Sequence, residues 1–367
     1  MRYCSRCVLP DTKPGIWLDA EGVCSACRSN EQKRSIDWDA RRSELARLAD
    51  EIRGSNGNGY DCIVPVSSGK DSFYQTWMMK VVQRLHVLCV VVIPHLQTRE
   101  GISNLNALVS NLHVDLVKVS VKPGTLRILR RRAFFEIGEP NWAEHCAVFA
   151  GVARVAYAYR VPLVVWGEDI AVEFGGSTSN TRVASAEDLI ENDLIKKRTL
   201  EDFFGEDVAE GDVYFYRHPP KDELKRRQLR SIYLGYYDWW DGHRHYEVAK
   251  ELGFRERSNP LAGNILNYDN IDEKLCEINI WFKFLKFGFW RPTDQCCYQI
   301  WNARMTREEA VEIVNARQYE FPGEYLKEFL EYHEITETQF WETVERFRNP
   351  VIWHKLDRRW RLKVPLV

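Results

Sequence analysis

Residues 60–72, YDCIVPVSSGKDS, decide the fold of this chain. The first half of this segment is a short, nearly continuous apolar run, which is typical of a buried parallel strand. A loop of small residues follows, and a helical pattern then continues over residues 72–85. A loop between a strand and a helix N-terminus presents backbone N–H groups and the positive end of the helix dipole to an anion. The segment therefore predicts a strand, an anion-binding loop and a helix, with an ordinary serine-rich N-cap as the alternative.

Three further apolar, β-branched runs follow, at residues 87–93, 114–121 and 161–166, and helical patterns separate them at residues 100–112 and 142–159. Strands that alternate with helices predict an α/β fold with a doubly wound parallel sheet. We expect three segments: residues 1–58 as a cysteine knuckle with a linking helix, residues 59–240 as the α/β domain, and residues 241–367 as a helical region without a clear strand.

The charge balance excludes some classes of protein. The 367 residues include 51 Lys and Arg against 53 Asp and Glu, a net charge of −2. This balance argues against a chain whose main affinity is for nucleic-acid phosphates, so we expect no nucleic-acid partner. Because no apolar run approaches the ~18–20 residues of a membrane helix and no signal peptide is evident, we expect a cytoplasmic protein without a membrane partner.

Four of the ten cysteines lie within the first 27 residues: Cys4, Cys7, Cys24 and Cys27. Their spacing, C-x2-C-x16-C-x2-C, is typical of a structural zinc site. Two thiolates from each tight turn can close a tetrahedron around Zn²⁺, which leaves no open position for catalysis. An iron–sulfur cluster and a pair of disulfides are the alternatives. In each case we expect a structural role for the four cysteines.

The loop residues after the first strand carry complementary chemistry. Lys70 adds a positive charge, and the hydroxyl groups of Ser67 and Ser72 can bond phosphate oxygens. Asp71 fits a phosphate site only when a divalent cation bridges the carboxylate to the phosphates. The Walker A pattern is not met, because Lys70 is followed by aspartate and the earlier glycine is absent.

On these residues, SSGKDS resembles the PP-loop, S-G-G-x-D-S, of the ATP pyrophosphatase superfamily, with Ser68 in place of the first glycine. The resemblance extends further. Residues 1–28, WGED at 166–169, LGYYDWWDG at 234–242, FKFLKFGFWRPTDQ at 282–295 and MTREEAVEIV at 305–314 are similar to segments of the N-acetyl sugar amidotransferases. That family converts acetamido groups of bacterial surface-polysaccharide sugars, including those of lipopolysaccharide O-antigen, into acetamidino groups.

The resemblance implies a reaction. ATP is cleaved between its α and β phosphates, the amide oxygen is adenylated, and ammonia then displaces AMP. The implied cofactors are ATP, Mg²⁺ and a structural Zn²⁺. The pyrophosphate cradle is assigned to Ser67, Ser68, Gly69, Lys70 and Ser72, and Asp71 is assigned to Mg²⁺.

Further candidates lie outside the loop. Glu168 and Asp169 follow a strand at its carboxyl end, where open α/β sheets bind ligands, and could hold a metal or take a proton from ammonia. The alternative is that both cap the next helix. Arg291 and Asp294 are candidates for the sugar carboxylate or a nucleotide phosphate, against an ordinary ion pair. His145 is a candidate substrate residue, against a helix histidine. Residues 175–180, GGSTSN, are a candidate substrate loop.

The expected substrate is a nucleotide-activated acetamido sugar. After residue 240 no cysteine lies in a strand-supported turn, so we expect ammonia from a separate glutaminase subunit. The resemblance implies a second partner, a barrel subunit similar to the cyclase of histidine biosynthesis. The alternative function is tRNA thiolation by a PP-loop enzyme. Such enzymes often carry paired cysteines near the position of Cys146, whereas this chain has only one there.

Overall fold

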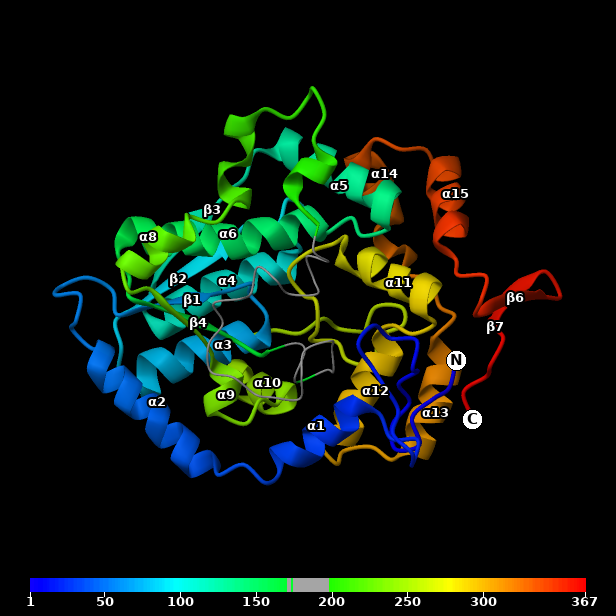
Figure 1. Cartoon of the computed structure of the whole chain (residues 1–367), viewed down its shortest axis with the longest axis horizontal. Helices are drawn as coiled ribbons and strands as arrows, with labels where there is room; N and C mark the ends of the chain where they lie inside the picture. The colour runs from blue at the N-terminus through cyan, green and yellow to red at the C-terminus, as the bar shows by residue number, and fades with distance from the viewer. Residues whose placement is uncertain (170–172, 174–197) are drawn as a thin grey trace.

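The computed structural model describes residues 1–169, 173 and 198–367. Its centre is a parallel sheet in the order β3-β2-β1-β4-β5. The strands are β1 Cys62–Pro65, β2 Val87–Val92, β3 Asp115–Val119, β4 Leu163–Trp166 and β5 Arg230–Tyr233. This arrangement confirms the predicted α/β class (Figure 1). The sequence analysis missed β5, because its four residues begin with Arg230 and Ser231 and form no apolar run.

Helices cover both faces of the sheet, which makes it doubly wound. Val64 and Cys89 pack into one core with α2 Trp38–Ile52, α3 Lys70–Trp77 and α4 Arg99–Leu112. Ile63 and Leu88, their neighbours in sequence, pack into the opposite core with α5 Pro123–Ile137 and α6 Trp142–Tyr159. Successive strand residues point to opposite faces, so both faces need apolar side chains. The strand order reverses between β1 and β4, and ligands bind at such a switch point.

Several shorter elements connect this framework. They are α1 Ser25–Lys33, a π-helical turn Met78–Val82, the 3-10 turns Leu200–Phe203, Glu210–Tyr216 and Gly323–Tyr325, and helices α8 Lys221–Arg226 and α9 Leu234–Tyr237. Within the described residues, no helix is both long and apolar enough to span a bilayer. The candidate substrate loop at residues 175–180 lies outside the described residues.

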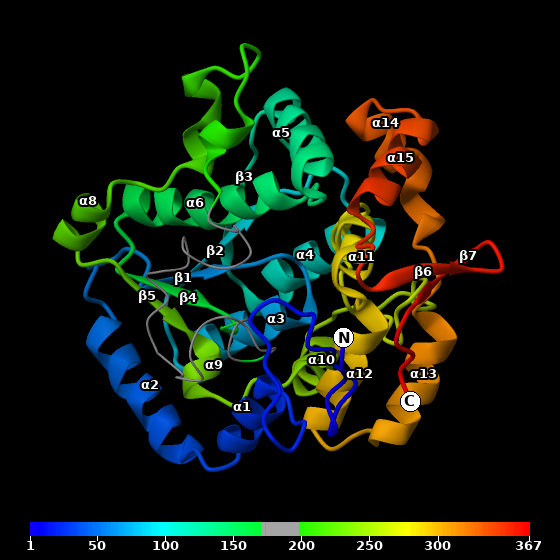
Figure 2. The same ribbon diagram turned by 45° about the vertical axis from the view of Figure 1, so that its right-hand side comes forward.

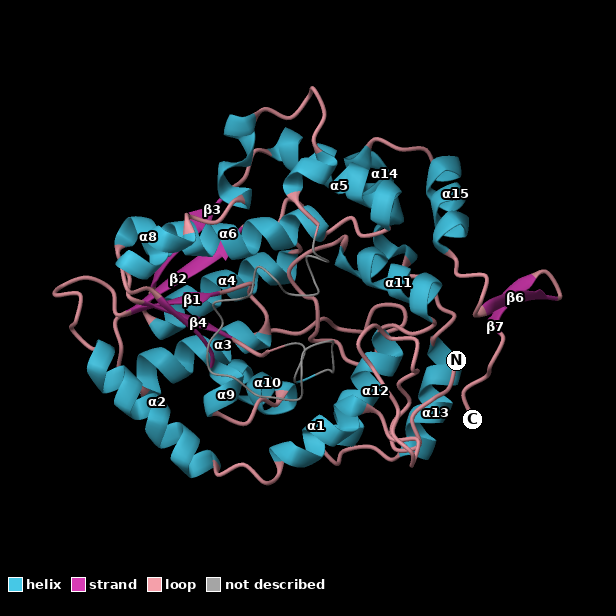
Figure 3. Cartoon of the chain, viewed as in Figure 1, coloured by secondary structure: helices cyan, strands magenta, loops and turns pink. Residues whose placement is uncertain are grey.

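The C-terminal region is mainly helical, as expected. Its helices are α10 Gly242–Glu251, α11 Cys276–Phe287, α12 Arg291–Trp301, α13 Arg307–Arg317, α14 Leu326–His333 and α15 Glu337–Phe347. The expectation of no strand here was wrong, because β6 Trp353–Leu356 and β7 Arg359–Leu362 form an antiparallel hairpin (Figure 3). Asp357 and Arg358 both have positive φ, which favours a tight two-residue turn, but charged residues hide the strand pattern.

The segments pack closely on one another. Helix α10 lies against α3, and Tyr246, Ala249 and Ile271 belong to the same core as β1. The α/β core therefore extends past residue 240, and the expected boundaries stay predictions. The N-terminal knuckle packs against α12 and α13, and the two chain ends lie near each other in both views (Figures 1 and 2).

Candidate functional site

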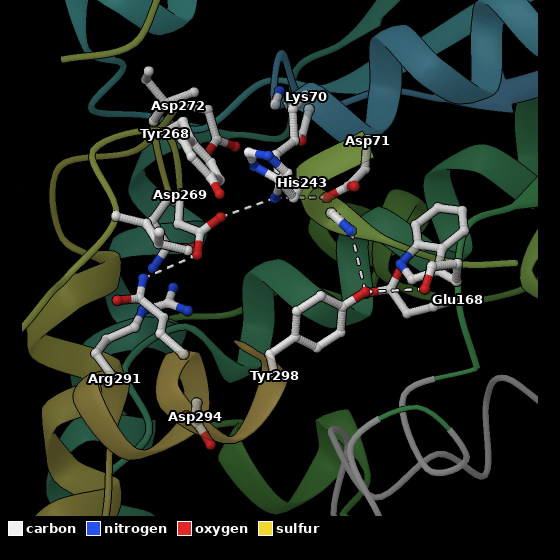
Figure 4. Close-up of a pocket in the computed structure, with 18 of the residues that line it drawn as sticks. Lys70, Asp71, Glu168, His243, Tyr268, Asp269, Asp272, Arg291, Asp294 and Tyr298 are labelled. Carbon is white, nitrogen blue, oxygen red and sulfur yellow. Dashed lines mark hydrogen bonds and ion pairs between the residues drawn. The ribbon is translucent and has the colours of Figure 1, made fainter. Parts of the chain in front are cut away.

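A cavity of about 270 Å³ opens beyond the carboxyl ends of β1 and β4. Figure 4 shows Lys70 and Asp71 on one side, with Arg291 and Tyr298 facing them. Three helices begin at this cavity: α3 at Lys70, α10 at Gly242 and α12 at Arg291. Each helix N-terminus carries a partial positive charge and N–H groups that have no partner within the helix. Their convergence favours a ligand with several negative charges.

The loop between β1 and α3 is held by its own hydroxyl groups. The backbone N–H of Ser67 donates to Ser72 Oγ at 2.9 Å, and the N–H of Gly69 donates to Ser67 Oγ at 3.4 Å. Ser68 has φ +83°, a conformation that glycine adopts with far less strain than serine. Ser67 and Gly69 line the cavity, whereas Ser68 is buried behind it and the Ser72 hydroxyl is engaged within the loop.

The charged and titratable side chains next to the loop form one network of ion pairs and hydrogen bonds. Lys70 Nζ lies 3.1 Å from Asp71 Oδ2 and 2.8 Å from Asp269 Oδ1 (Figure 4). His245 Nδ1 lies 2.7 Å from Asp71 Oδ1. Burial alone would raise the pKa of Asp71. The interactions with Lys70 and His245 lower it by more than burial raises it, so the pKa of Asp71 lies well below the usual range. Asp71 is thus held as a carboxylate at the cavity wall.

Glu168 has a different environment on the same wall. Burial raises its pKa to about 7, and the nearby charge of Asp71 adds to the effect. The preceding residue, Gly167, lets the backbone pass close to the Trp240 ring, because a Cβ at this position would lie only 2.8 Å from that ring. A carboxyl group with a pKa near neutrality can accept or donate a proton under cellular conditions. Two carboxyl groups that repel each other can also share a divalent cation.

Helix α12 supplies the facing wall. The guanidinium of Arg291 lines the cavity, and its Nε lies 3.6 Å from Glu277 Oε1. Burial disfavours the Arg291 charge, but Glu277 and Asp269 outweigh burial and raise its pKa. Asp294 pairs with Lys283 at 2.6 Å. Tyr298 Oη accepts from the N–H of Gly242 and donates to the Trp240 carbonyl, both at 3.1 Å.

The sequence analysis missed the loop before α11, where Tyr268, Asp269 and Asp272 line the cavity. Gln295 Nε2 donates to Asp269 Oδ2 at 2.9 Å, and Gln295 Oε1 accepts from the N–H of Ile265 at 2.7 Å. The segment YDNIDE at residues 268–273 carries four acidic or amide side chains in six residues. This density was the available signal, but it is equally typical of a surface turn.

The cavity brings together Lys70, Asp71, Glu168, Arg291 and Asp294, which the sequence analysis selected from distant segments. Besides Ser68 and Ser72 of the loop, the candidates Asp169 and His145 do not line it. The backbone carbonyl of Asp169 accepts the backbone N–H of Glu173 at 2.9 Å. His145 lies in the first turn of α6, where burial lowers its pKa. The structure therefore does not bring His145 or Asp169 to this cavity.

The four N-terminal cysteines form a second site. Their Sγ atoms all lie within 4.8 Å of one another and are buried, so the cluster can hold a metal ion. The indole N–H of Trp301 donates to Cys27 Sγ at 3.2 Å, and the backbone N–H of Cys24 donates to Cys4 Sγ at 3.2 Å. Such hydrogen bonds favour thiolates over thiols. Trp301 belongs to α12, so the cluster is tied to the helix that carries Arg291.

Comparisons with known proteins bear on the C-terminal region. Residues 262–365 match the family described as LPS biosynthesis protein WbpG-like, C-terminal domain. No curated protein matches the chain. One similar solved structure is the U34-tRNA thiolase NcsA from Methanococcus maripaludis with its 4Fe-4S cluster. Its identity is 13% and its TM-score 0.32, over 83% of this chain and 86% of that chain, which is too weak to bear on function. The family match agrees with the resemblance to proteins of surface-polysaccharide biosynthesis, and the matched region includes Asp269, Arg291 and Tyr298 of the cavity wall.

Proposed function

We propose, from the premise that residues 262–365 form a WbpG-like domain of lipopolysaccharide biosynthesis, that this chain is an ATP-dependent sugar amidotransferase. One observation carries the proposal. One cavity is lined both by Lys70 and Asp71 of the loop and by two residues of the matched region, Asp269 and Arg291. A nucleotide bound at the loop would therefore meet a sugar bound against the family domain. The proposed substrate is a nucleotide-activated acetamido sugar, and the product carries an acetamidino group.

The chemistry requires activation of an amide. The amide oxygen attacks the α-phosphorus of ATP, the bond to the bridging oxygen breaks, and pyrophosphate leaves. Ammonia adds to the activated carbon, and AMP departs with the former amide oxygen. The protein contributes position and charge, as in other phosphoryl displacements. In this proposal Lys70 and the N-terminus of α3 stabilise the pyrophosphate, and Glu168 accepts a proton from the attacking nitrogen.

Asp71 is the residue that would hold Mg²⁺. It suits the ion because its carboxyl group lines the cavity and stays ionised beside Lys70 and His245. When bound, Mg²⁺ neutralises phosphate charge. Asp269 pairs with Lys70, so we expect a bound phosphate to draw Lys70 away from this carboxylate.

We assign Zn²⁺ to the cysteine cluster. A tetrahedral ion about 2.3 Å from each sulfur places the sulfurs about 3.8 Å apart. The separations are 3.8 Å for Cys4 and Cys27 and 3.7 Å for Cys7 and Cys24. An iron–sulfur cubane needs a wider frame, because each thiolate binds a different iron. The zinc assignment predicts one equivalent of zinc and no visible absorption from iron–sulfur charge transfer.

The ammonia source is also part of the proposal. Free ammonia is scarce in cells, so we propose a separate glutaminase subunit together with a barrel subunit similar to the cyclase of histidine biosynthesis. Exogenous ammonium should replace both in vitro. Strict dependence of the purified chain on glutamine would contradict this assignment.

The test incubates the purified chain with ATP, Mg²⁺, ammonium and a panel of nucleotide-activated acetamido sugars. We expect release of AMP and pyrophosphate and a product that has gained a positive charge. Asp71→Asn should lower AMP release by about 100-fold or more, since it removes the charged ligand, while the circular dichroism stays unchanged. Formation of ADP, or full activity of Asp71→Asn, would refute the proposal.

The alternative of tRNA thiolation receives no support from Cys146. Burial raises the pKa of this thiol to about 12, so it is a poor nucleophile. The cavity-lining residues include no cysteine among the described part of the chain. Cys146→Ala should therefore keep AMP-forming activity with a sugar, and tRNA should not bind on filters. Tight tRNA binding together with loss of activity in Cys146→Ala would favour thiolation.

A further inference from the structure

His245 stands directly behind Asp71. Its Nδ1 lies 2.7 Å from Asp71 Oδ1, and the ring has no solvent exposure. We propose that His245 is a positioning residue, whose Nδ1–H holds one oxygen of Asp71 so that the carboxylate keeps a single orientation toward the cavity. The inference rests on the proposed function, because Asp71 meets phosphates only when the cavity binds a nucleotide.

The imidazole ring is itself fixed by its neighbours. It stacks on Tyr74 with ring centres 4.0 Å apart at 19°, and the Trp240 ring meets it edge-on at 4.4 Å and 77°. Tyr74 is anchored through its hydroxyl, which donates to the buried carboxylate of Asp238. Asp238 also forms ion pairs with Arg42 at 3.2 Å and with Arg244 at 3.1 Å. The ring therefore cannot turn without disturbing a packed and hydrogen-bonded layer.

The surroundings determine which nitrogen carries the proton. Nε2 is buried and has no hydrogen-bond partner among the described residues, whereas Nδ1 faces a carboxylate oxygen that can only accept. The proton therefore belongs on Nδ1, which donates to Asp71. Charged groups that act on the ring are Asp71, Lys70 and Asp241. Asp71 therefore gains a hydrogen-bond donor at Oδ1 while it remains a carboxylate.

His245 and Lys70 hold different oxygens of Asp71. Lys70 Nζ lies 3.1 Å from Oδ2, on the side of the cavity, and also binds Asp269. Without the imidazole, Lys70 would be the remaining side-chain donor to Asp71 among the described residues, and the carboxylate could rotate to follow it. Loss of a group that orients a metal ligand typically costs about 10–100-fold in metal affinity or activity.

The experiment separates the donor from the ring. His245→Asn places an amide N–H near the position of Nδ1 but removes the ring. His245→Phe keeps a ring between Tyr74 and Trp240 but removes the donor. The matched control is His333→Phe, because His333 is equally buried and its Nδ1 bonds the Phe329 carbonyl at 2.8 Å. Its ring packs against Phe134 and Phe329 and does not line the cavity. Thermal unfolding of all three variants measures the structural cost.

The main readout is equilibrium binding of Mn²⁺ with ATP, alongside ATP without metal and the rate of AMP release. We expect His245→Phe to bind the Mn²⁺–ATP pair about 10-fold or more weakly, while metal-free ATP binding is unchanged. His245→Asn should stay within about threefold of wild type, since it keeps the donor. Unchanged Mn²⁺–ATP binding in His245→Phe would overturn the inference. An equal loss in both variants would also overturn it, because ring packing would then be responsible.

The same data distinguish failure of the proposed function. If wild type binds Mn²⁺–ATP, His245→Phe weakens it, and no acetamido sugar yields AMP, the positioning role stands and the amidotransferase assignment falls. If wild type does not bind the pair at all, both are refuted.

Discussion

Replacing Glu168 by glutamine should make the protein more stable at high pH while removing its activity. Burial and the charge of Asp71 raise the pKa of Glu168 from its ordinary value of 4.5 to about 7. Glutamine has nearly the same shape but never ionises. The wild-type protein therefore pays an electrostatic cost at high pH that the variant does not.

The sign and size of this effect follow from proton linkage. The folded protein binds the Glu168 proton more tightly than the unfolded chain, so wild-type stability falls as pH rises from about 4.5 through about 7. A tenfold change in proton affinity is worth about 1.36 kcal/mol, so the shift from 4.5 to about 7 gives a total loss of about 3–4 kcal/mol. Because about 2–3 kcal/mol of this loss falls between pH 5 and pH 8, we expect the stability of Glu168→Gln relative to wild type to rise by that amount over this interval.

Urea unfolding at both pH values measures the free energy of unfolding. Glu273 and Asp272, whose pKa values burial raises to about 7 and about 6, also titrate here, but they are present in both proteins and cancel in the difference. The control is Glu247→Gln, which replaces a carboxyl group by an amide at an exposed site on α10. A Glu168→Gln difference that is the same at pH 5 and pH 8, or that becomes destabilising at pH 8, would refute the reasoning.

Three further substitutions test the loop, the metal cluster and the cavity wall. Ser68→Gly should raise the free energy of unfolding by about 0.5–1 kcal/mol, because it relieves the strained φ of +83°, and unchanged or lower stability in urea would contradict this. Trp301→Phe removes the N–H that bonds Cys27 Sγ and should weaken metal retention about 10–100-fold in a chelator competition; equal retention would show that the hydrogen bond is irrelevant. Gln295→Leu leaves the Asp269 carboxylate and the Ile265 N–H short of a partner and should destabilise the fold by about 2–3 kcal/mol in urea unfolding, whereas a neutral effect would mean that water replaces the amide.

Features that depend on neighbours in sequence were predictable. The strands at β1, β2, β3 and β4 are apolar runs between helical patterns, so their period was visible. The four cysteines were recognisable because two pairs, each with two residues between its cysteines, can bind one metal ion. By contrast, β5 and the hairpin β6–β7 were missed, since their strands are short and carry charged residues on exposed positions.

The cavity was only partly predictable. Lys70, Asp71 and Glu168 follow strands of one parallel sheet, so their nearness follows from topology. Arg291 came from a family resemblance, and neither Asp269 nor His245 was selected. Each of these pairs with a loop residue about 170 to 200 positions earlier in the chain, through contacts of 2.8 Å and 2.7 Å. No local pattern records such a pairing.

By itself, the sequence determined the parallel sheet, the position of its anion-binding loop and the cysteine cluster, because these depend on short-range periodicity and spacing. The tertiary structure alone decided the chemistry of the cavity. It placed the partly buried Glu168 beside Asp71 and so raised its pKa to about 7, and it placed His245 behind Asp71 and Arg291 opposite. Charge interactions and desolvation act through space, so these properties exist only once distant segments have packed together.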